Sequence, residues 1–150
     1  MTVDLHSENL ALMNLTKSFL VLLTLSASLY SAPNRDRVLK AIVQIESRGD
    51  YSKFGAGGEA GIYQIAPKTW AQYSSKSIKV ASTKAGQVES ERVAKAHYDM
   101  IVEFFKKKNI EVNVYNIALA WNAGIGRVSR DDLASRHRSY AKRVNSLYNN

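Results

Sequence analysis

Apolar side chains recur every three or four residues over most of the sequence after residue 33, and this spacing limits the fold more than any other feature. In the first such stretch Val38, Ile42 and Ile45 share one face of a helix that Asn34 or Asp36 could cap and that runs to Arg48. Further helices are predicted from Pro67, over 88–108, over 112–124 and over 130–148. The spacing therefore predicts a mainly α chain folded as a helical bundle.

One glycine-rich segment breaks the helical pattern. Between Asp50 and Gly61 the glycines stand at 55, 57, 58 and 61, and they favour an irregular loop because glycine adopts backbone angles that other residues avoid. Gly49 is predicted to end the helix before this loop. The remaining sequence has room for two or three short strands at most. We therefore predict a small irregular or β-hairpin region beside the helical bundle.

The length and the cysteine count bound the chemistry. The chain has 150 residues and no cysteine. This length suits one domain with a single core that needs no metal or disulfide. Without cysteine there are no disulfides, thiolate zinc sites, cysteine nucleophiles or thiol-linked lipids.

The N-terminal segment has the layout of a secretory signal peptide. A lysine precedes the apolar run 19–25, and small residues then extend to a proline. The run is far shorter than the roughly 20 residues of a spanning helix, so an uncleaved membrane anchor is the weaker alternative. A disordered or buried N-terminal helix is a further alternative. Met13 is an alternative start. We predict a signal peptide over 1–32, cleavage between Leu29 and Pro33, and an exported domain over 33–150, in the periplasm or outside the cell.

The charge indicates the class of partner. The formal net charge is +8, with basic clusters at 106–108 and 135–143. An exported basic protein is attracted to anionic partners such as cell-wall polymer, lipid head groups or nucleic acid. A charge run is most often only the solvated face of a helix. No nucleic-acid-binding module is recognisable, so nucleic acid is not a predicted partner.

Glu46 is the first candidate for catalysis. It follows Ile45 in the last turn of the first predicted helix and precedes the glycine-rich loop. Burial there would raise the pKa of its carboxyl group and keep the proton on at neutral pH, as a general acid requires. Most glutamates in last helical turns are simply solvated, so the position alone does not establish a catalytic role.

Three separated blocks resemble one enzyme family. They are "ESRGDYSKFGAGGEAGIYQIAP", "ALAWNAGIGRV" and "RSYAKRV". Their order and spacing are similar to the catalytic domain of soluble lytic transglycosylases and goose-type lysozymes, whose pattern is E-S, G-[LI]-x-Q-[IV]-x-P, A-[YW]-N-A-G-x-G-R-V and R-x-Y. The resemblance spans Ile45 to Val144. It implies an α+β lysozyme-like fold, mainly α, with the helices around a glycan-binding cleft.

The resemblance implies roles for the catalytic acid and for two residues beside it. Glu46 corresponds to the family's single catalytic acid/base. Ser47 would orient its carboxyl group or cap the local backbone, and a polar residue that merely ends a helix explains Ser47 equally well. Tyr140 matches the tyrosine of R-x-Y, which lies near the acid in this family; core packing is its plain alternative.

Five further residues correspond to the family's substrate-binding positions. Gly61 would allow close backbone approach, and Gln64 would reach the glycan. Tyr63, between them, is expected to form wall or core rather than to take part in chemistry. Trp121 and Asn122 would line the cleft with an aromatic face and an amide, although Trp121 could also be a core residue.

The sequence departs from the family pattern in several places. Many relatives have a serine where this chain has Gly55, and the usual E-T-R-x-Y has Arg136 in place of its glutamate. The block N-I-x-x-G-x-x-Y-L is absent unless Tyr98 is its remnant. These differences concern the outer cleft and the substrate register.

The type of reaction depends on a second carboxyl group. Glycoside hydrolysis usually takes two, roughly 5 to 10 Å apart. Asp50 and Glu59 are the nearby candidates, and neither has a spacing that places it across the sugar from Glu46. A transglycosylase needs only one acid, so a lytic transglycosylase that forms 1,6-anhydro ends is predicted, with a goose-type lysozyme as the alternative. The prediction includes no cofactor and no metal.

Two other classes of function also fit the sequence. A non-catalytic peptidoglycan-binding module would keep the cleft without turnover, and retention of Glu46, Gln64 and Asn122 argues against it. A basic interaction protein of a secretion or conjugation apparatus is compatible with wall cleavage. The predicted partner is peptidoglycan, acted on by a monomer, and the sequence does not choose among cell-wall remodelling, a secretion or conjugation system, and a virion.

Overall fold

The computed structural model describes residues 31–150, which form one compact unit from residue 32 onward. The predicted signal peptide, 1–32, lies outside the described residues but for its last two positions. The α-helices are α2 (Arg35–Glu46), α3 (Pro67–Tyr73), α4 (Gln87–Lys107), α5 (Val114–Ala123), α6 (Ile125–Ser129) and α7 (Ser135–Asn149), and two 3₁₀ helices, η1 (Ile78–Ser82) and η2 (Lys84–Gly86), precede α4. The prediction of a mainly α chain is confirmed. Within the part described, no helix has both the length and the apolar character needed to cross a bilayer.

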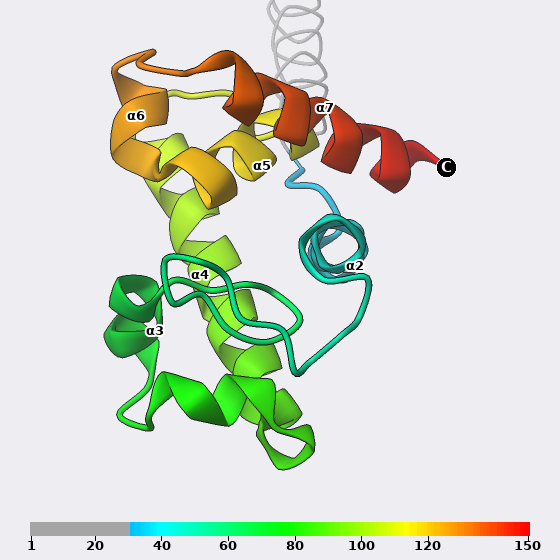
Figure 1. Cartoon of the computed structure of the whole chain (residues 1–150). Coiled ribbons are helices and arrows are strands. Elements are labelled where there is room, and N and C mark those ends of the chain that lie inside the picture. The colour runs from blue at the N-terminus through cyan, green and yellow to red at the C-terminus, as the bar shows by residue number, and fades with distance from the viewer. Residues whose placement is uncertain (1–30) are drawn as a thin grey trace, which may run out of the picture. The chain divides into compact units, whose positions relative to one another are not determined.

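The core forms around α4, the longest helix of residues 31–150. It runs from the loop-rich part of the domain, beside α3 and η1, to the group formed by α5, α6 and α7 (Figure 1). Val93, Ile101 and Phe105 of α4 are fully buried. Helix α7 packs against both α5 and α2. The first and last described helices are therefore neighbours, and this contact positions the site.

Helix α2 begins where the sequence predicts and ends earlier. The Asn34 side chain accepts a hydrogen bond from the backbone N–H of Arg37 at 3.0 Å, as an N-cap residue does. The helix ends at Glu46 rather than at Arg48, because Arg48 and Gly49 both have positive φ angles, 57° and 87°. The chain thus turns sharply directly after Glu46 and leaves this side chain at the helix end.

The other predicted helices differ mainly at their boundaries. Helix α4 lies within one residue of its predicted ends at both sides. Helix α5 ends before Gly124, whose φ of 86° suits glycine, as predicted. The short helix α6 was not predicted. Helix α7 starts at Ser135, so the acidic pair 131–132 lies in the preceding turn rather than at the helix start.

The glycine-rich region is an irregular loop. Among residues 31–150 the only β pairing consists of isolated antiparallel bridges, Phe54 with Ala60 and Ala60 with Ile65. Gly61 has a φ of 75°, and a Cβ atom there would lie 2.4 Å from the carbonyl oxygen of Ala81. This glycine therefore lets the loop pack against η1.

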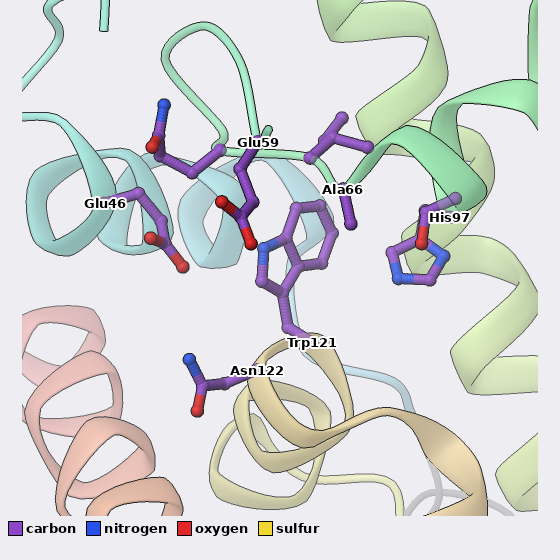
Figure 2. A pocket seen from close by; sticks show the side chains of 9 residues that line it. Glu46, Glu59, Ala66, His97, Trp121 and Asn122 are labelled. Atoms are coloured by element: carbon purple, nitrogen blue, oxygen red, sulfur yellow. The ribbon is translucent and has the colours of Figure 1, made fainter. Parts of the chain in front are cut away.

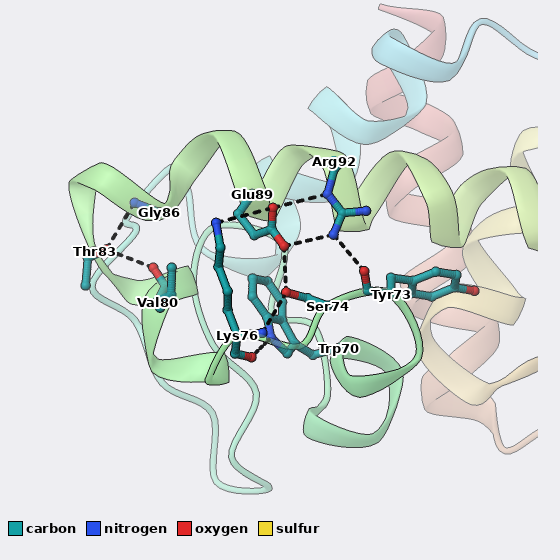
Figure 3. A network of polar contacts seen from close by, with 9 residues as sticks. All are labelled: Trp70, Tyr73, Ser74, Lys76, Val80, Thr83, Gly86, Glu89 and Arg92. Atoms are coloured by element: carbon teal, nitrogen blue, oxygen red, sulfur yellow. Dashed lines mark hydrogen bonds and ion pairs between the residues drawn. The ribbon is translucent and has the colours of Figure 1, made fainter.

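A polar network fastens the end of α3 to α4. The Glu89 carboxylate accepts hydrogen bonds from the Ser74 hydroxyl at 2.6 Å and from the Arg92 guanidinium at 2.8 Å, and Arg92 also donates to the Tyr73 carbonyl (Figure 3). These partners lower the pKa of Glu89 to about 2, Arg92 contributing most. The Trp70 indole donates to the Lys76 carbonyl at 2.7 Å. The segment after α3 is thus held in one conformation on the flank of the loop region.

Candidate active site

One pocket gathers side chains from five separate parts of the domain. Four of these parts are helices, namely the end of α2, α3, α4 and the end of α5, and the loop before α3 is a fifth part that also contributes (Figure 2). The lining residues are Glu46, Glu59, Gln64, Ile65, Ala66, Thr69, His97, Trp121 and Asn122. Four residues predicted from the sequence therefore meet here: Glu46, Gln64, Trp121 and Asn122. In the described part of the chain no group of three or more potential metal ligands is present.

Glu46 is held by contacts on two sides. The Tyr140 hydroxyl on α7 donates a hydrogen bond to Glu46 Oε1 at 2.8 Å. The Lys53 ammonium group, in the loop, donates to the backbone carbonyl of Glu46. Because Oε1 is occupied by the phenol, Oε2 is the oxygen left for a ligand in the pocket. The carboxyl group is therefore oriented before any substrate arrives.

The environment of Glu46 favours its protonated form. Burial is the largest influence and raises the pKa of the carboxyl group, and the nearby charge of Glu59 raises it further. The Tyr140 hydrogen bond and the positive charges of Lys53 and Arg143 act in the opposite direction, but the pKa remains above its usual value. A carboxyl group with a raised pKa in a pocket can deliver a proton near neutral pH.

Glu59 shares this pocket, although the spacing of the sequence did not place it there. Its carboxylate Oε2 accepts a hydrogen bond from the Gly57 backbone N–H at 3.0 Å. A Cβ atom at Gly55 would lie 2.3 Å from the same oxygen, and one at Gly57 would lie 2.6 Å from Oε1. Glycine at both positions therefore leaves room for the Glu59 carboxylate where it lies. A side chain at position 55, where many relatives have a serine, would require the Glu59 side chain to shift.

Gln64 lies in the pocket in a strained conformation. Its φ is 45°, which a non-glycine residue rarely adopts. Its side-chain nitrogen donates to the carbonyls of Lys53 at 3.0 Å and Gly61 at 2.8 Å. Both amide protons are therefore used within the loop, so a ligand would meet the acceptor oxygen Oε1.

Ser47 and Tyr63 lie away from the pocket lining. Ser47 is buried; its hydroxyl donates to the Ile62 carbonyl at 2.8 Å and accepts from the Gly49 N–H at 3.1 Å, which ties the end of α2 to the loop. Tyr63 is also buried, and burial together with nearby acidic groups raises its pKa to about 12. Ser47 therefore supports the loop, and neither residue lines the pocket.

The opposite wall is formed by Trp121 and Asn122 at the end of α5. The Trp121 ring meets the His97 ring edge-on, with 5.0 Å between centroids. Burial lowers the pKa of His97 to about 4, so this imidazole is neutral near pH 7. The Asn122 amide oxygen lies 2.7 Å from Nδ1 of His137, a buried residue of α7.

Three residues in or beside the pocket were not predicted from the sequence to lie there. Helical spacing indicated burial for His97 but not its place beside the pocket. Thr69 has no distinguishing pattern. His137 acts through a contact with a residue on another helix, and no spacing rule reveals such a contact.

The comparisons with known proteins identify one family. Residues 30–144 match the family model described as the transglycosylase SLT domain. Neither the curated proteins nor the solved structures include a match to this chain. The matched region covers the whole pocket and Tyr140.

Proposed function

The chain belongs to the transglycosylase SLT domain family, and from this premise we propose that it is a peptidoglycan lytic transglycosylase. It cleaves the β-1,4 bond between N-acetylmuramic acid and N-acetylglucosamine and leaves 1,6-anhydro ends. The observation that carries the proposal is the pair formed by Glu46 and Tyr140, a carboxyl group with a raised pKa oriented by a buried phenol. Trp121 and Asn122 form the wall against which the glycan lies.

The reaction needs one proton carrier and no water. Glu46 donates its proton to the glycosidic oxygen, the bond from that oxygen to C1 breaks, and the leaving sugar departs as an alcohol. The acetamido group of the muramic acid stabilises the positive charge at C1. The C6 hydroxyl of the same sugar then forms the new bond to C1 and gives its proton to the Glu46 carboxylate, which restores the acid.

Hydrolysis is the second candidate, and the placement of Glu59 favours it. Hydrolytic enzymes of this kind use a second carboxylate to position a water, and Glu59 lines the same pocket as Glu46. In that reaction water replaces the C6 hydroxyl as nucleophile, and the product gains a reducing end. We keep transglycosylation as the main proposal because the Glu59 carboxylate is already bound by the loop through Gly57.

The masses of the released fragments distinguish the two reactions. Purified peptidoglycan is digested with the protein, and the muropeptides are weighed before and after borohydride treatment. Anhydro ends lack one water and resist reduction; reducing ends carry that water and accept hydride. A predominantly reducible product would replace the transglycosylase proposal with hydrolysis, and no soluble product would favour a binding module.

Two variants assign the roles of the carboxyl groups. Glu46→Gln keeps the shape of the side chain but cannot supply a proton, so wall lysis should be lost by several orders of magnitude while the thermal unfolding curve stays cooperative. Glu59→Gln, the matched control in the same pocket, should keep the anhydro product. If Glu59→Gln abolishes cleavage, the second carboxyl group is required and the hydrolytic mechanism gains support.

The setting of the activity is also part of the proposal. We propose export of the domain to the periplasm or the cell exterior, where peptidoglycan is accessible. The system served could be wall remodelling, a secretion or conjugation apparatus, or a virion. The strongly basic character of the chain supports an anionic polymer as substrate.

A further inference from the structure

His137 contacts the pocket wall without lining the pocket. Only 6 % of its surface is exposed, and its Nδ1 atom lies 2.7 Å from Oδ1 of Asn122. Figure 2 shows the Asn122 amide with its nitrogen turned towards Glu46 and its oxygen turned away. The family resemblance assigns no role to position 137.

The contact with Asn122 fixes the tautomer of His137. An amide oxygen can only accept a hydrogen bond, so Nδ1 must carry the proton. The other ring nitrogen, Nε2, is buried without a partner among the described residues. A bare lone pair is tolerated there better than an N–H group, because orphaned buried N–H groups are the rarer and costlier case.

The charges around His137 agree with a neutral ring. Burial is the largest influence and lowers its pKa, the neighbouring Arg136 and Arg127 lower it further, and Asp132 opposes them. The reverse arrangement, with the Asn122 nitrogen donating to Nδ1, would require the proton on Nε2 and would bury that N–H without a partner. The observed arrangement is therefore the more stable one.

We propose that His137 is a positioning residue that locks the Asn122 amide with its NH₂ group facing the pocket, so that this wall donates a hydrogen bond to an acceptor oxygen of the glycan. The proposal rests on the proposed function for the identity of the ligand. The opposite wall offers acceptors, namely the Glu59 carboxylate and Gln64 Oε1, so the Asn122 NH₂ group supplies a donor that those two groups do not.

The tautomer is measured directly on the unmodified full chain. Nitrogen-15 NMR of the histidine rings at pH 7 should show His137 with a protonated Nδ1 and a bare Nε2, and the signal is assigned with His137→Asn. A protonated Nε2 with a bare Nδ1 would overturn the proposal. This measurement needs no substrate, so its result is independent of whether the protein is a transglycosylase, a hydrolase or a binding module.

A double-mutant cycle tests the action through Asn122. His137→Leu should lower kcat/KM on a soluble glycan about tenfold, the value of one ordinary hydrogen bond, and Asn122→Ala should lower it by at least as much. The double variant should be no worse than Asn122→Ala alone, because His137 acts only through the amide. His137→Asn, which keeps an N–H near the position of Nδ1, should restore most of the loss.

The outcomes separate this proposal from the proposed function. Losses that multiply in the double variant, or no rescue by His137→Asn, would show a merely structural role for His137 and overturn the inference. If the chain cleaves no glycan, the same cycle is run on glycan binding by the Glu46→Gln chain, with the dissociation constant in place of kcat/KM. If His137→Leu fails to fold, Asn122→Asp replaces it, since that variant presents an oxygen in place of the NH₂ group and should lose as much as Asn122→Ala.

Discussion

Replacing Tyr140 with phenylalanine should change the pH dependence of catalysis as well as its rate. The Tyr140 hydroxyl donates to Glu46 Oε1 at 2.8 Å, and this bond opposes the rise in the pKa of Glu46. A hydrogen bond to an ionised group contributes about 1.5–3 kcal/mol and one to a neutral group about 0.5–1.5 kcal/mol. The difference, roughly 1–1.5 kcal/mol, corresponds to about one pH unit.

The sign follows from the proposed role of Glu46 as the acid. The reaction starts from the protonated carboxyl group, so activity falls as pH rises through the pKa of Glu46. Tyr140→Phe removes an interaction that favours the ionised form, so the pKa rises and the alkaline limb of the profile should move up by about one pH unit. The rate at the optimum should fall, because the carboxyl group loses the contact that orients it.

The assay is the pH profile of kcat/KM on a soluble glycan fragment. Tyr98→Phe is the matched control, because Tyr98 is similarly buried and donates one hydrogen bond, at 2.6 Å to the Pro33 carbonyl, on a different side of the domain. Its profile should not move. An alkaline limb that stays in place in Tyr140→Phe, or that shifts equally in Tyr98→Phe, would refute the assignment of Glu46 as the acid controlled by Tyr140.

Three further predictions concern stability and processing. The pKa of Glu46 lies above 4.5 in the folded state, so the folded chain holds this proton more tightly than the unfolded chain, and the stability that the proton contributes is lost as pH rises above 4.5. Glu46→Gln should therefore unfold at a higher temperature than the native chain at pH 7 and at nearly the same temperature at pH 4. Gly61→Ala should lower the free energy of unfolding by about 1–3 kcal/mol more than Gly49→Ala in urea titrations, because both have positive φ but only position 61 places the new methyl group against a carbonyl oxygen. N-terminal sequencing of the exported protein should find a first residue between Leu29 and Pro33, whereas an uncleaved product in the membrane pellet would indicate an anchor.

Local rules were sufficient for most of the helices. The sequence predicts features that depend on neighbours along the chain. These are the cap at Asn34, the helix end at Gly124 and the periodic burial of Val93, Ile101 and Phe105. The sequence pattern places the end of α2 too late, because Arg48 adopts a positive φ angle that its residue type does not predict. The short helix α6 has only five residues, which are too few to show a period.

Only those residues of the candidate site that belong to sequence motifs could be predicted. Glu46 and Tyr140 were found through separated blocks whose order is informative, although no spacing rule states that they touch. Glu59 could not be placed, because its position depends on the path of a loop in which two glycines fold around the carboxylate. The role of His137 depends on a contact between two helices, and a contact of that kind has no period.

The bond between Glu46 and Tyr140 joins the first described helix to the last, across 94 positions of sequence. The acid therefore takes its working orientation only after α7 has been synthesised and has docked onto α2. A ribosome-bound chain, or one crossing a membrane in extended form, has Glu46 in solvent and no oriented proton donor. Under the proposed function, the chain would therefore have an oriented proton donor for glycan cleavage only once α7 has docked onto α2.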